Sequence, residues 1–154
     1  MYPTLVAVHV LAAAVWIGGT VALVFAGVPV LRQLPPNQRA DLVRQLGRCW
    51  RPIGWTALGI LGASGVWLAF GYWGADSAQT LFHTSNGHAL IAKAILFVVL
   101  VGSATMHDFV LGPRLNRQIR EGRPRTLLRP MQIVGWVSFA CTLALPILGV
   151  VIAT

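Results

Sequence analysis

The residues of this sequence best suited to chemistry are four histidines, one lysine and one aspartate, namely His9, His83, His88, His107, Lys93 and Asp108. Neutral imidazoles bind haem iron or copper, a lysine ammonium balances an anionic group, and a carboxylate accepts a metal or a proton. Most of these residues stand in strongly apolar sequence, where an ionisable side chain is expensive and is a functional candidate by default. They are therefore the first candidates for a functional site.

Spacing along the chain divides these residues into two groups. His107 and Asp108 stand 19–20 residues beyond His88, which is about 28 Å at helical rise. The other histidines and Lys93 fall near the opposite ends of their apolar segments. One metal ion therefore cannot be bound by both His9 and His107, and the sequence predicts an outer layer and an inner pair.

The composition identifies the solvent of this chain as a lipid bilayer. Of the 154 residues, 56% are hydrophobic and only 10% are charged, with a mean hydropathy of +0.69, whereas soluble domains are about 25% charged. Four apolar segments are long enough to cross a bilayer as helices. We predict an all-α four-helix transmembrane bundle that forms one domain over residues 1–154, with spans at about 4–31, 52–72, 88–111 and 131–153.

The basic residues predict the orientation of this bundle. Eleven of the twelve are arginines that lie in segments 32–51 and 114–130, whereas 73–87 has none. Basic loops on one side follow the positive-inside rule and suit anionic headgroups. We expect the arginine-rich loops in the cytoplasm, both termini and loop 73–87 outside, and a multi-pass protein of a bacterial-type inner (plasma) membrane. The net charge of +8 therefore indicates lipid rather than nucleic acid.

The outer layer offers one interior histidine and two near water. Helical periodicity places His9 and Trp16 on one face of the first span, so Trp16 would cover the inner side of anything bound at His9. His9 is a ligand of haem iron or copper, or else it bonds to a helix carbonyl. His88 and His83 are second metal ligands or ordinary solvated histidines.

The remaining ionisable residues also have two interpretations each. Lys93 neutralises a haem propionate or pairs with Asp76, or it reaches the outer headgroups along its flexible stem. His107 and Asp108 anchor the inner end of the third span, with Asp108 paired to an arginine such as Arg114, Arg32 or Arg51. The alternative is an inner station for a metal ion or a proton. Neighbouring helical residues point about 100° apart, so this pair need not be in contact.

Three motifs carry a resemblance to a known family. "HVLAAAVWIGG" (9–19), "GHALIAKAILF" (87–97) and "HDFVLGPRL" (107–115) resemble the core motifs of the copper-resistance D (CopD) domain, in order and across three of the four spans. The first-span histidine and tryptophan and the lysine of the third span are also similar, more weakly, to the HemJ group of four-helix membrane proteins, linked to protoporphyrinogen oxidation and b-type haem. The HemJ group has a histidine close to that lysine, whereas in this sequence His88 precedes Lys93 by five residues.

These observations lead to a first hypothesis and two alternatives. The first is b-type haem in the outer half of the bundle, bound by His9 and by His88 or His83, with Lys93 and Trp16 beside it. It implies an oxidoreductase that exchanges electrons or hydrogen with a quinone or another membrane redox partner. The second is CopD-like copper handling or resistance at the outer face, ranked lower because Cu(I) prefers sulfur ligands and the chain has three methionines and two cysteines. The third is a non-catalytic assembly subunit, and homo-oligomerisation is left open.

Overall fold

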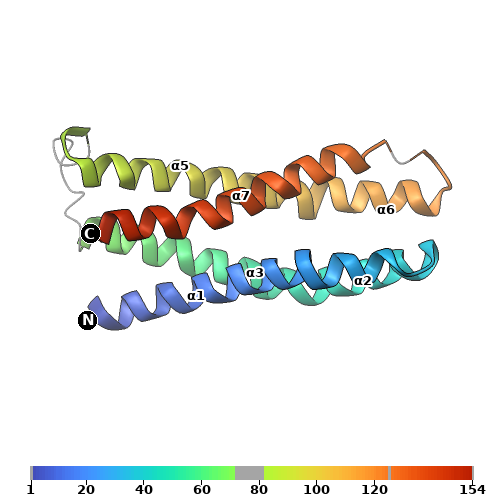
Figure 1. Cartoon of the computed structure of the whole chain (residues 1–154), viewed down its shortest axis with the longest axis horizontal. Helices are drawn as coiled ribbons and strands as arrows, with labels where there is room; N and C mark the ends of the chain where they lie inside the picture. Colours follow the sequence, from blue (N-terminus) through green and yellow to red (C-terminus); the bar gives the residue numbers. More distant parts are fainter. Residues whose placement is uncertain (1, 72–81, 125, 154) are drawn as a thin grey trace.

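The computed structural model describes residues 2–71, 82–124 and 126–153. Every regular element in these ranges is a helix, as Figure 1 shows. Four helical stretches are long and apolar enough to span a membrane, namely Pro3–Arg32, Gln38–Gly71, Gly87–Arg120 and Leu128–Val150. The prediction of an all-α four-helix transmembrane bundle is confirmed.

Two of these stretches are built from several helical elements. The first consists of α1 (Tyr2–Ala22), the π-helical turn η1 (Leu23–Gly27) and α2 (Val28–Arg32). The second is α3 (Pro36–Gly71), the third is α5 (Ser85–Thr105) with the π-helical turn η2 (Met106–Leu111) and α6 (Gly112–Arg120), and the fourth is α7 (Leu128–Ala153).

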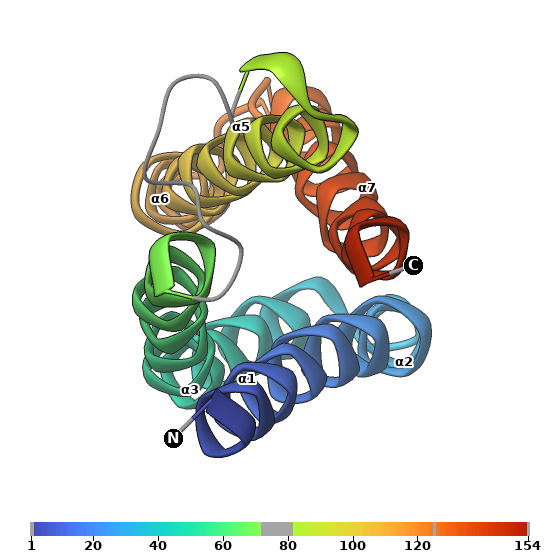
Figure 2. The same cartoon turned by 90° about the vertical axis from the view of Figure 1, so that its left-hand side faces the viewer.

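The bundle consists of two helical hairpins. Helix α1 packs along α3 and helix α5 along α7, whereas contacts between the two hairpins are much sparser; the end-on view in Figure 2 shows the two pairs. The hairpins meet near the middle of the spans, in a core formed by Trp16, Ala57, Leu58, Leu100, Ala104 and Cys141. All four spans contribute to this core, so it separates the polar side chains of one half of the bundle from those of the other.

Glycines allow the first hairpin to close. A Cβ atom on Gly19 would overlap the Trp50 ring, and one on Gly54 would lie 3.1 Å from the Trp16 ring. In lipid, small residues of this kind let helices gain van der Waals contact. Gly19 and Gly54 thus make room for tryptophan rings between α1 and α3, whereas Gly18 meets nothing within 4 Å.

The helices continue past several prolines. The predicted third span ends at about residue 111, yet the helix continues through η2 into α6, with Pro113 near the start of α6. The first span also passes through a π-helical turn just before Pro29. Proline lacks an N–H and clashes with the carbonyl four residues earlier, and a π-bulge is one way in which a helix absorbs such a defect. Helix α3 includes Pro52, so most of the arginine-rich segment 32–51 and the predicted second span form one helix.

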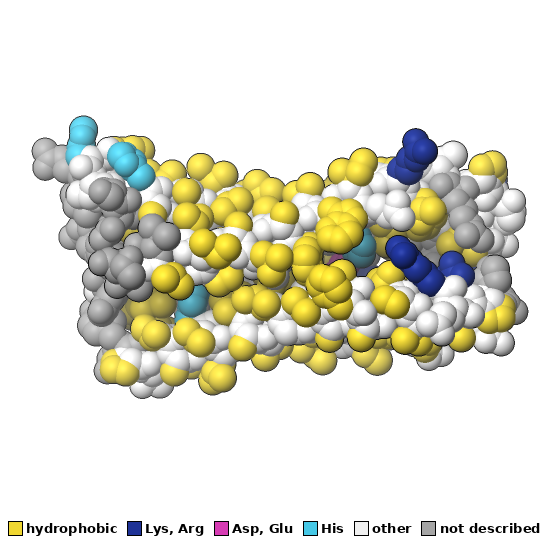
Figure 3. All heavy atoms as spheres, viewed as in Figure 1, with side chains coloured by type: hydrophobic (Ala, Val, Ile, Leu, Met, Phe, Trp, Pro, Cys, Tyr) yellow, Lys and Arg dark blue, Asp and Glu magenta, His cyan; other side chains and the backbone are white. Residues whose placement is uncertain are grey.

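The two ends of the bundle differ in charge. The chain begins and ends at the same end of the bundle in Figure 1, as four spans require. In Figure 3 dark blue lysine and arginine side chains gather at the other end, while hydrophobic side chains cover the middle. The arginine-rich segments therefore lie together at one end, which we call the arginine end.

Candidate functional site

The first-span histidine points into the bundle. His9 is half-buried on α1, and its Nδ1 lies 2.7 Å from Oγ of Ser64 on α3. A Cβ atom on the neighbouring Gly65 would lie 3.5 Å from Cε1 of the His9 ring. The packing of α1 against α3 thus places the imidazole against the buried hydroxyl of Ser64, and Gly65 leaves room for the ring.

The hydroxyl of Ser64 determines which nitrogen of His9 carries the proton. Ser64 Oγ donates its single hydrogen to the Ile60 carbonyl oxygen, at 2.5 Å. It can therefore only accept from the imidazole, so His9 Nδ1–H is the donor. The lone pair of the neutral ring is then on Nε2, which leaves that nitrogen able to bind a metal.

Lys93 lies in the same layer as His9. It is half-buried on α5 and reaches toward α7, where a Cβ atom on Gly149 would lie 3.3 Å from its Nζ. Its charge acts on the His9 ring. The predicted alternative partner, Asp76, lies outside the described residues. The first and third spans therefore do share one polar layer, and Lys93 makes it positive.

The two other outer histidines do not join His9 in the interior. His83 and His88 are exposed at the outer end, and Nε2 of His88 is bonded to the backbone oxygen of Phe82 at 2.8 Å. Among the residues that the structure describes, no three His, Cys, Asp or Glu side chains are grouped to hold a metal. His9 is thus the interior histidine of this layer.

Trp16 connects the two hairpins within the core. Its side chain is 8% exposed, and its Nε1 donates to Thr142 Oγ1 on α7 at 3.0 Å. Its ring lies 6.2 Å from that of Trp50, between centroids. Trp16 shares the inward face of α1 with His9, as predicted, and forms the floor of the outer layer.

A second polar cluster lies toward the arginine end. His107 Nδ1 is 3.0 Å from Oδ1 of Asp108, and Trp55 Nε1 donates to Oδ2 of the same carboxylate at 3.2 Å. Arg51 donates to the backbone oxygen of Asp108 at 2.9 Å, so the predicted arginine contact exists but reaches the carbonyl. Figure 3 shows a histidine beside an acidic side chain in a recess toward this end. We call these four residues the inner cluster.

The inner cluster depends on the π-helical turn η2. In a regular α-helix neighbouring side chains diverge, but His107 and Asp108 stand within Met106–Leu111 and are hydrogen-bonded. Single π-turns occur frequently at functional sites. Sequence reasoning missed Trp55; the available signal was an indole N–H one helical turn after Arg51.

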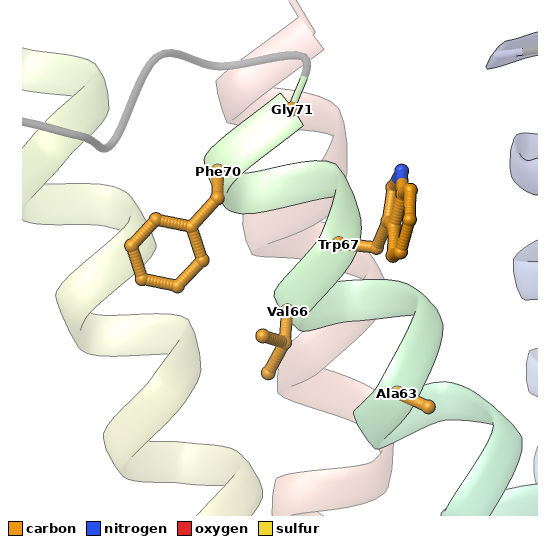
Figure 4. A pocket seen from close by; sticks show the side chains of 5 residues that line it. All are labelled: Ala63, Val66, Trp67, Phe70 and Gly71. Atoms are coloured by element: carbon orange, nitrogen blue, oxygen red, sulfur yellow. The ribbon is translucent and has the colours of Figure 1, made fainter.

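One surface hollow among the described residues is formed by a single helix. It is lined by five residues of α3, namely Ala63, Val66, Trp67, Phe70 and Gly71. Figure 4 shows Trp67 and Phe70 pointing to opposite sides of that helix, and they are 58% and 60% exposed. This hollow is apolar and holds none of the predicted site residues.

The structure thus defines a class of protein: a multi-pass four-helix membrane protein with an interior histidine on either side of an apolar core. The family model for copper resistance protein D matches residues 44–153, and the chain belongs to this family. It is also 34% identical over 119 residues to "Copper transport protein CutJ" of Bacillus subtilis (strain 168). The match covers 77% of this chain but 20% of the relative, so the chain spans about a fifth of that protein's length. No solved structure matches.

These matches overturn the prediction of b-type haem and of electron or hydrogen transfer, because the family and the relative are both named for copper. The structure gives a physical reason as well. The predicted second axial ligand, His88, is exposed and bonds through Nε2 to Phe82, and His83 is exposed. Neither of these histidines therefore supplies the predicted second axial ligand beside His9 in the interior.

Proposed function

We propose that this protein transports copper through the plasma membrane, with His9 receiving the ion in the outer layer. The observation that carries this proposal is the His9 imidazole, whose Nδ1 is held by Ser64 while Nε2 keeps its lone pair, in a chain of a copper family. The printed name of the relative, a copper transport protein, supports the same cargo.

The chemistry of the outer layer suits transfer better than storage. Imidazole nitrogen is a good copper ligand, and a ring held through its other nitrogen is the usual arrangement of a metal-binding histidine. Among the described residues His9 is the one interior imidazole of this layer, and it has the positive charge of Lys93 nearby. Binding at such a site is weak, and conduction requires an ion that can leave as well as arrive.

The difference in charge between the two ends of the bundle supports an orientation with His9 toward the outside of the cell. The arginine end fits the cytoplasmic side by the positive-inside rule, which places His9 in the extracytoplasmic half. Copper would then meet His9 first when it comes from outside the cell. The same bias supports a bacterial-type plasma membrane as the location and an anionic lipid surface as the partner of the arginines.

The core lies between the outer layer and the inner cluster, so copper can pass only if the helices move apart there. Leu100 is 1% and Leu58 2% exposed, so the spans are closed at this level. The hairpins contact each other sparsely, which makes their relative displacement the easiest way to open the core.

Copper movement across vesicles tests this function directly. Purified protein is reconstituted into liposomes, Cu(I) is kept reduced with ascorbate, and the copper inside is measured by elemental analysis. We expect wild-type vesicles to fill faster than empty ones, and His9→Ala to lower the rate at least about tenfold, as loss of metal-site residues does. His83→Ala, an exposed histidine of the same layer, is the control and should keep the rate. Wild-type vesicles that fill no faster than empty ones would disprove the function.

A further inference from the structure

The inner cluster presents a second histidine with a free ring nitrogen. The carboxylate of Asp108 is an acceptor, so His107 Nδ1 donates to it and Nε2 carries the lone pair of the neutral ring. Within residues 2–71, 82–124 and 126–153 no hydrogen-bond partner occupies Nε2. A Cβ atom on Gly135 of α7 would lie 3.9 Å from this nitrogen, so α7 passes the ring without a side chain, and the His107 side chain is 37% exposed.

The surroundings of His107 are those of a metal-binding imidazole. Metal-binding histidines commonly donate their second N–H to a carboxylate, which orients the ring and makes the free nitrogen more basic. Here Asp108 has that role, and Trp55 holds its other oxygen from α3. Arg51 holds the backbone of the same residue. Asp108 is therefore held from two positions on α3, through its carboxylate and through its backbone.

The inner cluster balances its own charge. Arg51 contributes one positive charge from α3 and Asp108 one negative charge from η2, while Gly135 is the α7 residue beside the ring. With a neutral His107 ring, the four residues of the cluster therefore have zero net charge. His9, in contrast, has the lysine charge beside it, and no carboxylate among the described residues is hydrogen-bonded to its ring.

We propose that His107 is a second copper-binding site, at the arginine end, which binds through Nε2 and is oriented by Asp108. The proposal rests on copper being the cargo of this protein. An ion that has left His9 and passed the core would next meet an imidazole that holds it more firmly. The inner cluster would then be the station from which copper leaves toward the cytoplasm.

Copper titration of the full-length protein with the outer histidine removed tests the site. Purified His9→Ala protein is titrated with Cu(I) against a chromophoric chelator, with ascorbate as the reductant. We expect one copper ion per chain, and an affinity at least about tenfold lower when His107→Ala is added. Adding His88→Ala instead, an exposed histidine that is engaged with Phe82, should change nothing. His107→Gln, which keeps an N–H for Asp108, repeats the test if the alanine variant does not fold.

A spectroscopic measurement separates the two proposals. X-ray absorption at the copper edge should show an imidazole ligand in the His9→Ala protein that disappears with His107→Gln. Absence of copper from the His9→Ala protein would overturn the inner site, while loss of vesicle transport in the same variant would still support the proposed function. Copper bound at His107 together with unchanged transport in His9→Ala would support the inner site and would overturn the role of His9 in transport. A His107 ring that binds protons but shows no copper-dependent signal would also overturn the site.

Discussion

The outer layer and the inner cluster hold a histidine in the same way but with different partners. In both, Nδ1 donates to a side-chain oxygen and Nε2 is left with its lone pair. The outer anchor is the neutral hydroxyl of Ser64, whereas the inner anchor is the carboxylate of Asp108. A charged acceptor makes a stronger hydrogen bond than a neutral one, so the inner ring is the better oriented and the more basic of the two.

The range matched by the family model includes the whole inner cluster but only part of the outer layer. All four residues of the inner cluster lie within the matched residues 44–153, and so do Ser64 and Lys93. His9 lies outside that range, on α1. The inner cluster is thus contained in the part of the chain that defines the family, while the outer layer is completed by the first helix. The two proposed stations therefore rest on separate parts of the chain and can be tested independently.

The largest effect expected from this comparison follows removal of the inner carboxylate. Asp108→Ala deprives His107 of its anchor, and loss of such a partner typically lowers metal affinity about 10- to 100-fold. We expect this loss in a His9→Ala background, measured by Cu(I) titration. Asp41→Ala, which removes an exposed aspartate paired with Arg44, is the control. Equal losses in the two variants would show that carboxylate charge in general, and not the anchor, matters.

A smaller effect is expected at the outer anchor. Ser64→Ala removes a neutral hydrogen bond worth about 0.5–1.5 kcal/mol, which corresponds to roughly a two- to tenfold loss of copper affinity. The measurement is a Cu(I) titration in a His107→Ala background, where His9 remains. Thr105→Ala is the control, because its hydroxyl bonds to the backbone of its own helix. A loss at Ser64 as large as that at Asp108 would remove the proposed difference between the stations.

The sequence was sufficient for the parts of the fold that depend on local pattern. Four apolar stretches predicted the four spans, and helical periodicity alone placed His9 and Trp16 on an inward face. Trp16 is indeed 8% exposed, and the neighbouring Ala12 on that face is 5% exposed. These features depend on a period of about 3.6 residues and on avoidance of lipid by polar groups, both of which can be read without knowing the tertiary structure.

The features that depend on neighbouring helices could not be obtained in this way. The contact of His107 with Asp108 requires the wider turn of η2, and the role of Trp55 requires α3 to pass beside that turn. The choice of haem over copper was wrong for a related reason. It rested on a count of sulfur ligands, and a count does not show which ring nitrogens the fold leaves free.

A more modest effect should follow removal of the indole N–H that holds Asp108. Trp55→Phe keeps an aromatic ring but abolishes a hydrogen bond whose length of 3.2 Å is at the long end of the normal range. We expect about a threefold loss of copper affinity at His107, with the outer layer unchanged. Trp67→Phe is the matched control, since that residue is 58% exposed on the same helix. A larger effect of Trp67→Phe would show that α3 packing, not the anchor, controls the site.

The smallest effect concerns Lys93 and has the opposite sign. Lys93→Gln removes a positive charge beside His9, so Cu(I) should bind His9 more tightly, by about fivefold at most for a partly solvated charge. The titration is made in a His107→Ala background, and the inner site of a Lys93→Gln, His9→Ala protein is the control, because His107 lies beyond the core. Tighter binding slows release, so transport at saturating copper should fall even though affinity rises. A parallel loss of affinity would contradict the charge argument and would mean that Lys93 supports the site through its contact with α7.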